Sequence, residues 1–110
     1  MVPYLFDGKL PDFNIGSNCG ASCNPAIEQA VHRRCEASQD YSSVVNGRFK
    51  GGWTTRHYGR PADGYHAIQM ELAQCNYMRE QSPWTYDTDR AAKLRVILAD
   101  ILKDLNAILA

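Results

Sequence analysis

The sequence YHAIQMELA occupies residues 65–73, shortly after FKGGWTTRHYGRP at residues 49–61. In the first of these stretches every second side chain is apolar or an imidazole: His66, Ile68, Met70 and Leu72. This alternation is the period of a β-strand, whose successive side chains point to opposite faces of a sheet. We therefore expect a strand over residues 65–73, with Gln69 and Glu71 together on its other face.

The preceding stretch contains the residue types of an anion-binding loop, which we expect to occupy residues 49–64. Arg56 and Arg60 each have a planar guanidinium that can clamp a carboxylate through two hydrogen bonds. Glycines permit backbone conformations and close approaches that a side chain would block, and the loop contains Gly51, Gly52 and Gly59. These residue types indicate a binding site for a small acid.

Glu71 is a carboxylate on an otherwise apolar strand next to this basic loop. Such a group is a candidate general base, because neighbouring cations and burial both change how readily it takes up a proton. The alternative is that Glu71 pairs with an arginine and fastens the loop to the sheet, since structural ion pairs are also common.

Upstream of the loop, the sequence predicts two further strands and a helix. Residues 13–15 and 41–45 have strand character and are followed by turn residues. Asn24 and Pro25 are typical of an N-cap and a first helical turn, so we expect a helix over residues 25–37.

The C-terminal part has apolar side chains at helical spacing: Leu94, Ile97, Leu98, Ile101, Leu102, Leu105, Ile108 and Leu109. They predict an amphipathic helix that covers one side of the sheet. A helix that binds a partner or a membrane surface is the alternative, and its mixed charge argues against a membrane.

This order of elements predicts an α/β fold: a partial sheet with flanking helices. A length of 110 residues suits one domain, or a fragment of one, over residues 1–110. Because the sequence pattern predicts only about three strands, we expect an uncovered sheet edge. Marginal stability or self-association would be its consequence.

Composition excludes several classes of protein. Twelve basic residues balance twelve acidic residues, so no global field attracts nucleic acid or an anionic membrane. No stretch has the roughly 18 apolar residues of a membrane span, and the first residues do not resemble a signal peptide. We expect a cytoplasmic protein.

Cysteine spacing leaves three interpretations open. Cys19, Cys23, His32 and Cys35 could close a structural zinc site, which would suit a small non-catalytic interaction module. A disulfide is the second interpretation, and reduced structural thiols are the third.

Three segments resemble the C-terminal part of the N-formylglutamate amidohydrolase (N-formylglutamate deformylase) family. They are LFDGKLPDFNIG at residues 5–16, FKGG with TRHYGRP within residues 49–61, and HAIQMEL at residues 66–72. The resemblance implies hydrolysis of N-formyl-L-glutamate to formate and L-glutamate, a step of histidine degradation. It also implies a fold and a mechanism similar to those of zinc carboxypeptidases.

The resemblance also implies roles for individual residues. Glu71 would take the proton from zinc-bound water and pass it to the leaving amine. Arg56 and Arg60 would face the two substrate carboxylates. The other candidates for lining the substrate pocket are Asn14, His57 and Gln69.

The family's zinc ligands lie upstream of the segment that begins here at residues 2–3. None of the three histidines of this chain sits in an H-E-x-x-H pattern, so we expect no metal ligand within it. The resemblance therefore implies a fragment that needs zinc supplied by a missing N-terminal part and is inactive alone.

Overall fold

The computed structural model describes residues 8–109 and has a three-stranded mixed sheet at its centre. The central strand β1 (Phe13–Gly16) pairs in parallel with β2 (Ser43–Val45) and antiparallel with β3 (Gln69–Leu72). Helices pack on this sheet, so the predicted α/β class is confirmed.

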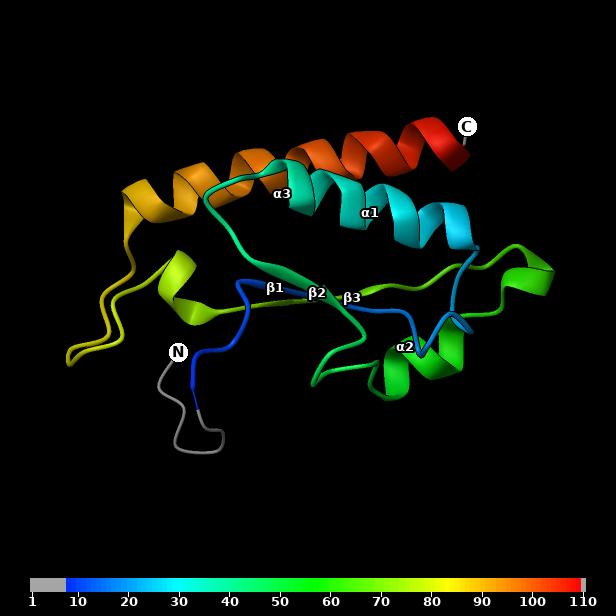
Figure 1. Cartoon of the computed structure of the whole chain (residues 1–110), viewed down its shortest axis with the longest axis horizontal. Coiled ribbons are helices and arrows are strands. Elements are labelled where there is room, and N and C mark those ends of the chain that lie inside the picture. Colours follow the sequence, from blue (N-terminus) through cyan, green and yellow to red (C-terminus); the bar gives the residue numbers. More distant parts are fainter. Residues whose placement is uncertain (1–7, 110) are drawn as a thin grey trace.

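Two helices cover one face of the sheet and lie side by side (Figure 1): α1 (Pro25–Ala37) and α3 (Thr88–Leu109). The predicted cap of the first helix is confirmed, since the Asn24 side chain accepts a hydrogen bond from the Ala26 amide at 2.9 Å. The side chain satisfies a backbone donor that the first helical turn leaves unpaired.

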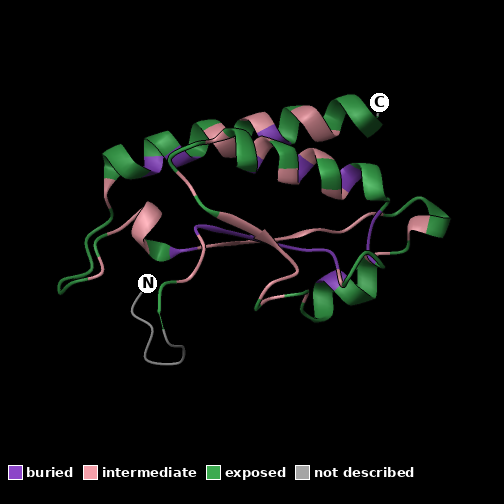
Figure 2. Cartoon of the chain, in the orientation of Figure 1, coloured by how far each residue is buried: buried purple, intermediate pink, exposed green. Residues whose placement is uncertain are grey.

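The hydrophobic core lies between β1 and the two helices, and Figure 2 shows buried residues in all three elements. Its buried members are Phe13, Ile15, Val31, Cys35, Leu94 and Ile101. The C-terminal helix therefore covers the sheet as expected. Its apolar stripe is only partly buried, since Leu102 stays 63% exposed and Leu109 59% exposed.

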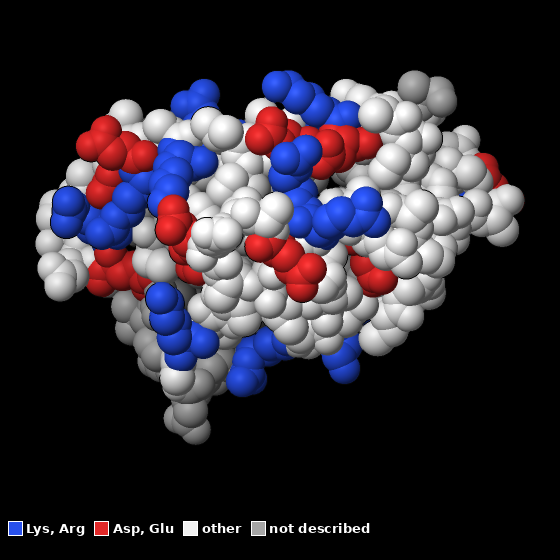
Figure 3. All heavy atoms as spheres, turned by 45° about the horizontal axis from the view of Figure 1, so that its top comes forward, with Lys and Arg blue, Asp and Glu red and all other residues white. Residues whose placement is uncertain are grey.

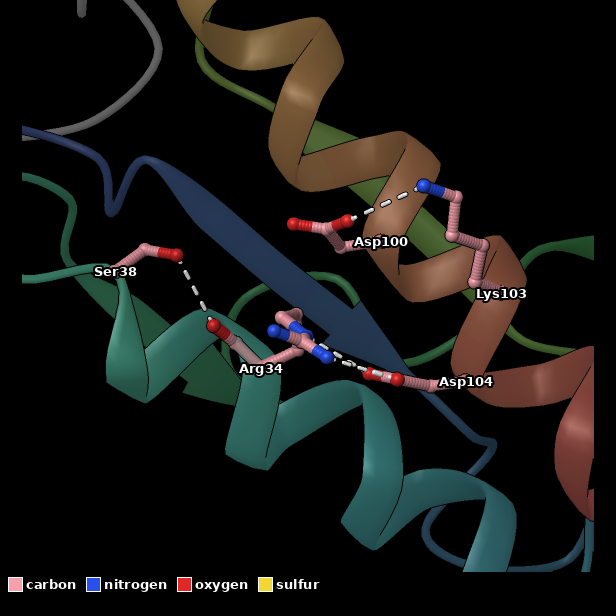
Figure 4. Close-up of polar contacts among 5 residues, drawn as sticks. All are labelled: Arg34, Ser38, Asp100, Lys103 and Asp104. Carbon is pink, nitrogen blue, oxygen red and sulfur yellow. Dashed lines mark hydrogen bonds and ion pairs between the residues drawn. The ribbon is translucent and has the colours of Figure 1, made fainter.

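A bidentate ion pair joins the two helices (Figure 4). Arg34 donates from Nε and Nη2 to the two carboxylate oxygens of Asp104, at 2.8 Å each. These hydrogen bonds lower the pKa of Asp104. Acidic and basic side chains alternate over this helical side of the molecule (Figure 3), in keeping with the balanced composition.

Three predicted boundaries were wrong: those of two strands and that of the loop before the third strand. The strand expected over 65–73 is confined to Gln69–Leu72, because Tyr65 pairs with Arg60 and the Ala67 amide bonds to the Ser22 carbonyl instead of to β1. The strand expected over 41–45 is Ser43–Val45.

The segment expected to be a loop over 49–64 contains a short helix, α2 (Trp53–Tyr58), and a 3-10 turn, η1 (Pro61–Asp63). A second such turn, η2 (Gln74–Asn76), follows β3. Over residues 8–109, no helix is long and apolar enough to cross a membrane.

Candidate active site

The sheet face opposite α1 and α3 is the polar one. Asn14 of β1 lies directly opposite Glu71 of β3, and Gln69 lies two residues before Glu71 on the same face. Helix α2 is on this side of the sheet (Figure 1). The predicted common face of Gln69 and Glu71 is thereby confirmed.

The segment that leads into α2 is fixed along β1. The Asn14 side chain donates to the Phe49 carbonyl and accepts from the Phe49 amide at 3.3 Å. The Asn18 amide donates to the Lys50 carbonyl at 2.7 Å. Gly16 permits this crossing, because a Cβ atom there would lie 3.0 Å from the Lys50 carbonyl.

Gln69 connects α2 to Glu71. Its Oε1 accepts hydrogen bonds from the Gly52 amide at 2.6 Å and from the Thr55 hydroxyl at 3.3 Å. Its Nε2 donates to Oε1 of Glu71 at 2.8 Å. One amide side chain thus bridges the start of α2 and the candidate base.

The other end of α2 is fixed by close packing. A Cβ atom at Gly59 would lie 2.6 Å from both Cβ and the carbonyl oxygen of Ser22. Ser22 is itself anchored, since its hydroxyl donates to the Ala67 carbonyl at 2.7 Å. Helix α2 is therefore held in place at both ends.

Glu71 is half-buried at the edge of a small pocket of about 40 Å³. The pocket is lined by Leu10, Pro11, Asn14, Phe49, Glu71, Leu72 and Ala73. Within residues 8–109 the second carboxylate oxygen of Glu71, Oε2, has no hydrogen-bond partner. The alternative in which Glu71 pairs with an arginine is not observed there, since its partner is Gln69.

The three basic candidates lie on or just after α2 and are exposed. His57 stacks on Trp53 with ring centroids 4.3 Å apart, and the Arg60 guanidinium lies 5.5 Å from the ring centroid of Tyr65. Neither Arg56 nor Arg60 pairs with an acidic side chain in the described part of the chain. The structure thus brings Asn14, Gln69 and Glu71 together. It leaves the side chains of Arg56 and Arg60 exposed.

No sequence pattern pointed to Thr55, which is buried and contacts Gln69. Its role is visible only in the folded helix. Thr55 follows Gly52 by three residues, and one turn of α2 places it on the side that contacts Gln69 of β3. A threonine three residues after a glycine is too common a pattern to predict such a contact.

The structural zinc site suggested by Cys19, Cys23, His32 and Cys35 was wrong. Cys35 faces the core, where burial raises its pKa to about 11, whereas Cys19 is exposed and His32 contacts Glu36 at 3.3 Å. Among residues 8–109, no three His, Cys, Asp or Glu side chains are grouped so that they could bind a metal ion. The cysteines described are free thiols, so the disulfide interpretation is wrong too.

Comparison with known proteins places these features in a family. The family model described as N-formylglutamate amidohydrolase matches residues 1–78. The N-formylglutamate deformylase of Pseudomonas aeruginosa is 54% identical over 106 residues, and that of Pseudomonas putida is 52% identical over 106 residues. Each alignment covers 96% of this chain and 40% of the relative.

The fold agrees with this match. The crystal structure of N-formylglutamate amidohydrolase from Ralstonia eutropha JMP134 superposes with a TM-score of 0.74 at 26% identity, over 88% of this chain and 34% of that chain. The chain spans about 40% of the length of its Pseudomonas relatives and corresponds to their C-terminal part. The chain belongs to the N-formylglutamate amidohydrolase family.

Proposed function

We propose that this chain supplies the C-terminal part of an active site that hydrolyses the formyl amide of N-formyl-L-glutamate, giving formate and L-glutamate. Family membership supports the substrate, since the relatives are named for it. The observation on which the chemistry depends is the Glu71 carboxylate on the polar face of the sheet, opposite α1 and α3. One of its oxygens accepts from Gln69 and the other is left without a protein partner in residues 8–109.

Glu71 acts as the proton carrier in this proposal. Its carboxylate takes a proton from the attacking water, whose oxygen adds to the formyl carbon. The carboxylate then returns the proton to the leaving nitrogen as the C–N bond breaks. A carboxylate with one oxygen oriented and one oxygen free is suited to both transfers.

Arg56 and Arg60 bind the two carboxylates of the substrate in this proposal. Both guanidinium groups are exposed and lack acidic partners within residues 8–109, so both are available to an anionic ligand. His57, the neighbour of Arg56 on α2, is a further proposed contact to the substrate. Asn14 acts indirectly, because both ends of its amide bond to the backbone of Phe49.

The resemblance also implies a zinc ion, together with a carboxypeptidase-like fold and a place in histidine degradation. The described residues do not themselves form a metal site, so the ligands would come from outside residues 8–109. No step given above for Glu71 or the arginines depends on that ion.

The test uses a hybrid protein in which this chain replaces the matched C-terminal region of the Pseudomonas aeruginosa relative. Formate release from N-formyl-L-glutamate is measured for the hybrid and for Glu71→Gln. We expect a loss of roughly 100-fold or more, the usual contribution of a positioned acid–base group. Glu36→Gln, the same chemical change at an exposed position on α1, is the control.

An active hybrid in which Glu71→Gln releases formate as fast as the parent would overturn the proposal. The 110-residue chain on its own is expected to release no formate above the uncatalysed background. The reason is that it corresponds to only 40% of its relatives.

A further inference from the structure

The orientation of the Gln69 side-chain amide is determined by its neighbours. Two donors, the Gly52 amide and the Thr55 hydroxyl, point at the same atom at 2.6 Å and 3.3 Å. That atom has to be the amide oxygen, since an amide nitrogen there would point its own N–H at the N–H of Gly52 and accept no hydrogen bond from it. The amide nitrogen is consequently turned toward Glu71.

This arrangement uses the hydrogen-bonding capacity of the amide almost completely. The carbonyl oxygen of Gln69 has two lone pairs and receives two donors, while Nε2 donates to Glu71 at 2.8 Å. A side chain engaged in this way has little capacity left for a substrate.

We infer that Gln69 is a positioning residue that holds Glu71 ready to accept a proton and couples it to α2, and that it is not a substrate ligand. The inference rests on the function proposed above. The N–H that Gln69 donates holds the Glu71 carboxylate in one orientation, and a general base has to be oriented toward the proton that it accepts. The bond also occupies Oε1 of Glu71 and leaves Oε2 without a hydrogen-bond partner in residues 8–109.

The coupling follows from where the two donors lie. Gly52 is the N-cap of α2, and the buried Thr55 is in its first turn. The next residues of the same helix are Arg56 and His57, the proposed substrate contacts. The amide that orients Glu71 is therefore bonded to the helix that carries the proposed substrate contacts.

The decisive variant is Gln69→Glu in the hybrid protein. The new carboxylate still accepts from Gly52 and Thr55, but it places a negative oxygen where Nε2 donated to Glu71. Like charges at this separation favour protonation of one of them. We expect the acid limb of the kcat/KM profile to move to higher pH by about one unit or more, with KM nearly unchanged at the optimum.

Gln69→Leu removes the donor without adding charge and leaves the Glu71 carboxylate without its orienting partner, so kcat should fall while KM stays nearly unchanged. Gln74→Glu, which makes the same chemical change at an exposed position just after β3, should leave the limb in place. If the Gln69 variants raise KM and leave the acid limb where it is, Gln69 contacts substrate and the inference is overturned.

Thr55→Val gives a second test if Gln69→Glu does not fold. It removes one of the two donors that orient the amide and does not touch Glu71. We expect kcat to fall while KM stays the same, and an unchanged kcat would overturn the coupling. These results are distinct from failure of the proposed function, which Glu71→Gln reports separately.

Discussion

At the scale of single residues, Asp12 shows how one buried carboxylate joins separate parts of the chain. It accepts from the amide of Ser42 at 2.8 Å and from its hydroxyl at 3.2 Å, and from the Asn76 side chain at 3.0 Å. Burial raises the pKa of Asp12, but the hydrogen bonds from Ser42 and Asn76 outweigh it and leave the pKa below its usual value.

Acid should therefore destabilise the chain through Asp12. A carboxyl whose pKa is lower in the folded state stabilises that state above its unfolded pKa of roughly 4, and this contribution is lost as the pH falls through the folded pKa. We expect the free energy of unfolding, measured by urea denaturation, to decrease below about pH 4. The decrease should be smaller in Asp12→Asn.

Asp63→Asn, at an exposed position in η1, is the matched control and should retain the full acid dependence. An Asp12→Asn variant as acid-sensitive as the parent chain would contradict the assignment.

The cysteines should differ in reactivity. Burial raises the pKa of Cys35 to about 11, so its thiol stays protonated at pH 8, whereas Cys19 is exposed. We expect a disulfide reagent such as Ellman's reagent to modify Cys19 in the native chain and Cys35 only after unfolding. Cys19→Ala should remove the rapid phase, and native labelling of Cys35 at the rate of Cys19 would count against this packing.

At the scale of elements, α2 depends on its surroundings for its position. It has only six residues, and neither end has a side-chain cap. Isolated helices of this length are not stable in water. Its position comes instead from the contact of Gly59 with Ser22 at one end and of Gly52 with Gln69 at the other.

Alanine substitution at the two ends should give different results. At Gly59 the new Cβ would meet Ser22 at 2.6 Å, so the backbone has to move, at a cost of about 1–3 kcal/mol. At Gly52 the nearest atom would be Oε1 of Gln69 at 3.4 Å, an ordinary contact. Urea unfolding should show a clear loss for Gly59→Ala and little change for Gly52→Ala, and equal effects would argue against this packing of α2.

At the scale of the whole molecule, the described part leaves much apolar surface uncovered. A groove of about 350 Å³ runs between α1, α3 and the residues around β3. It is lined by Ile27, Val31, His66, Ile68, Met70, Leu98, Ile101, Leu102, Leu105 and Leu109. In residues 8–109, β2 and β3 each pair only with β1, so both outer sheet edges are open.

This surface should make the isolated chain self-associate. Leu102→Asp places a charge in the groove and should shift the chain toward monomer in sedimentation velocity measurements. Val96→Asp is a close control, since Val96 is on the same helix and is 62% exposed against 63% for Leu102, yet it lies outside the groove. A monomeric parent chain with a sharp, reversible melt would contradict the expectation, as would equal effects of the two substitutions.

The elements that the sequence predicted well are those specified by neighbouring residues. The alternation around Gln69 and Glu71 fixes their common face, Asn24 begins α1, and the spaced leucines and isoleucines form α3. Each depends on backbone geometry over a few consecutive residues, for which a side-chain period or a capping residue is sufficient.

The sequence by itself therefore determined the class of fold, the helical layer and the polar face on which Glu71 lies. Only the tertiary structure decided that α2 is a helix, that Asn14 lies opposite Glu71, and that Gln69 donates to Glu71 because Gly52 and Thr55 occupy its oxygen. The physical reason is that these features depend on strand register and on packing between segments far apart in the chain, which no local pattern specifies.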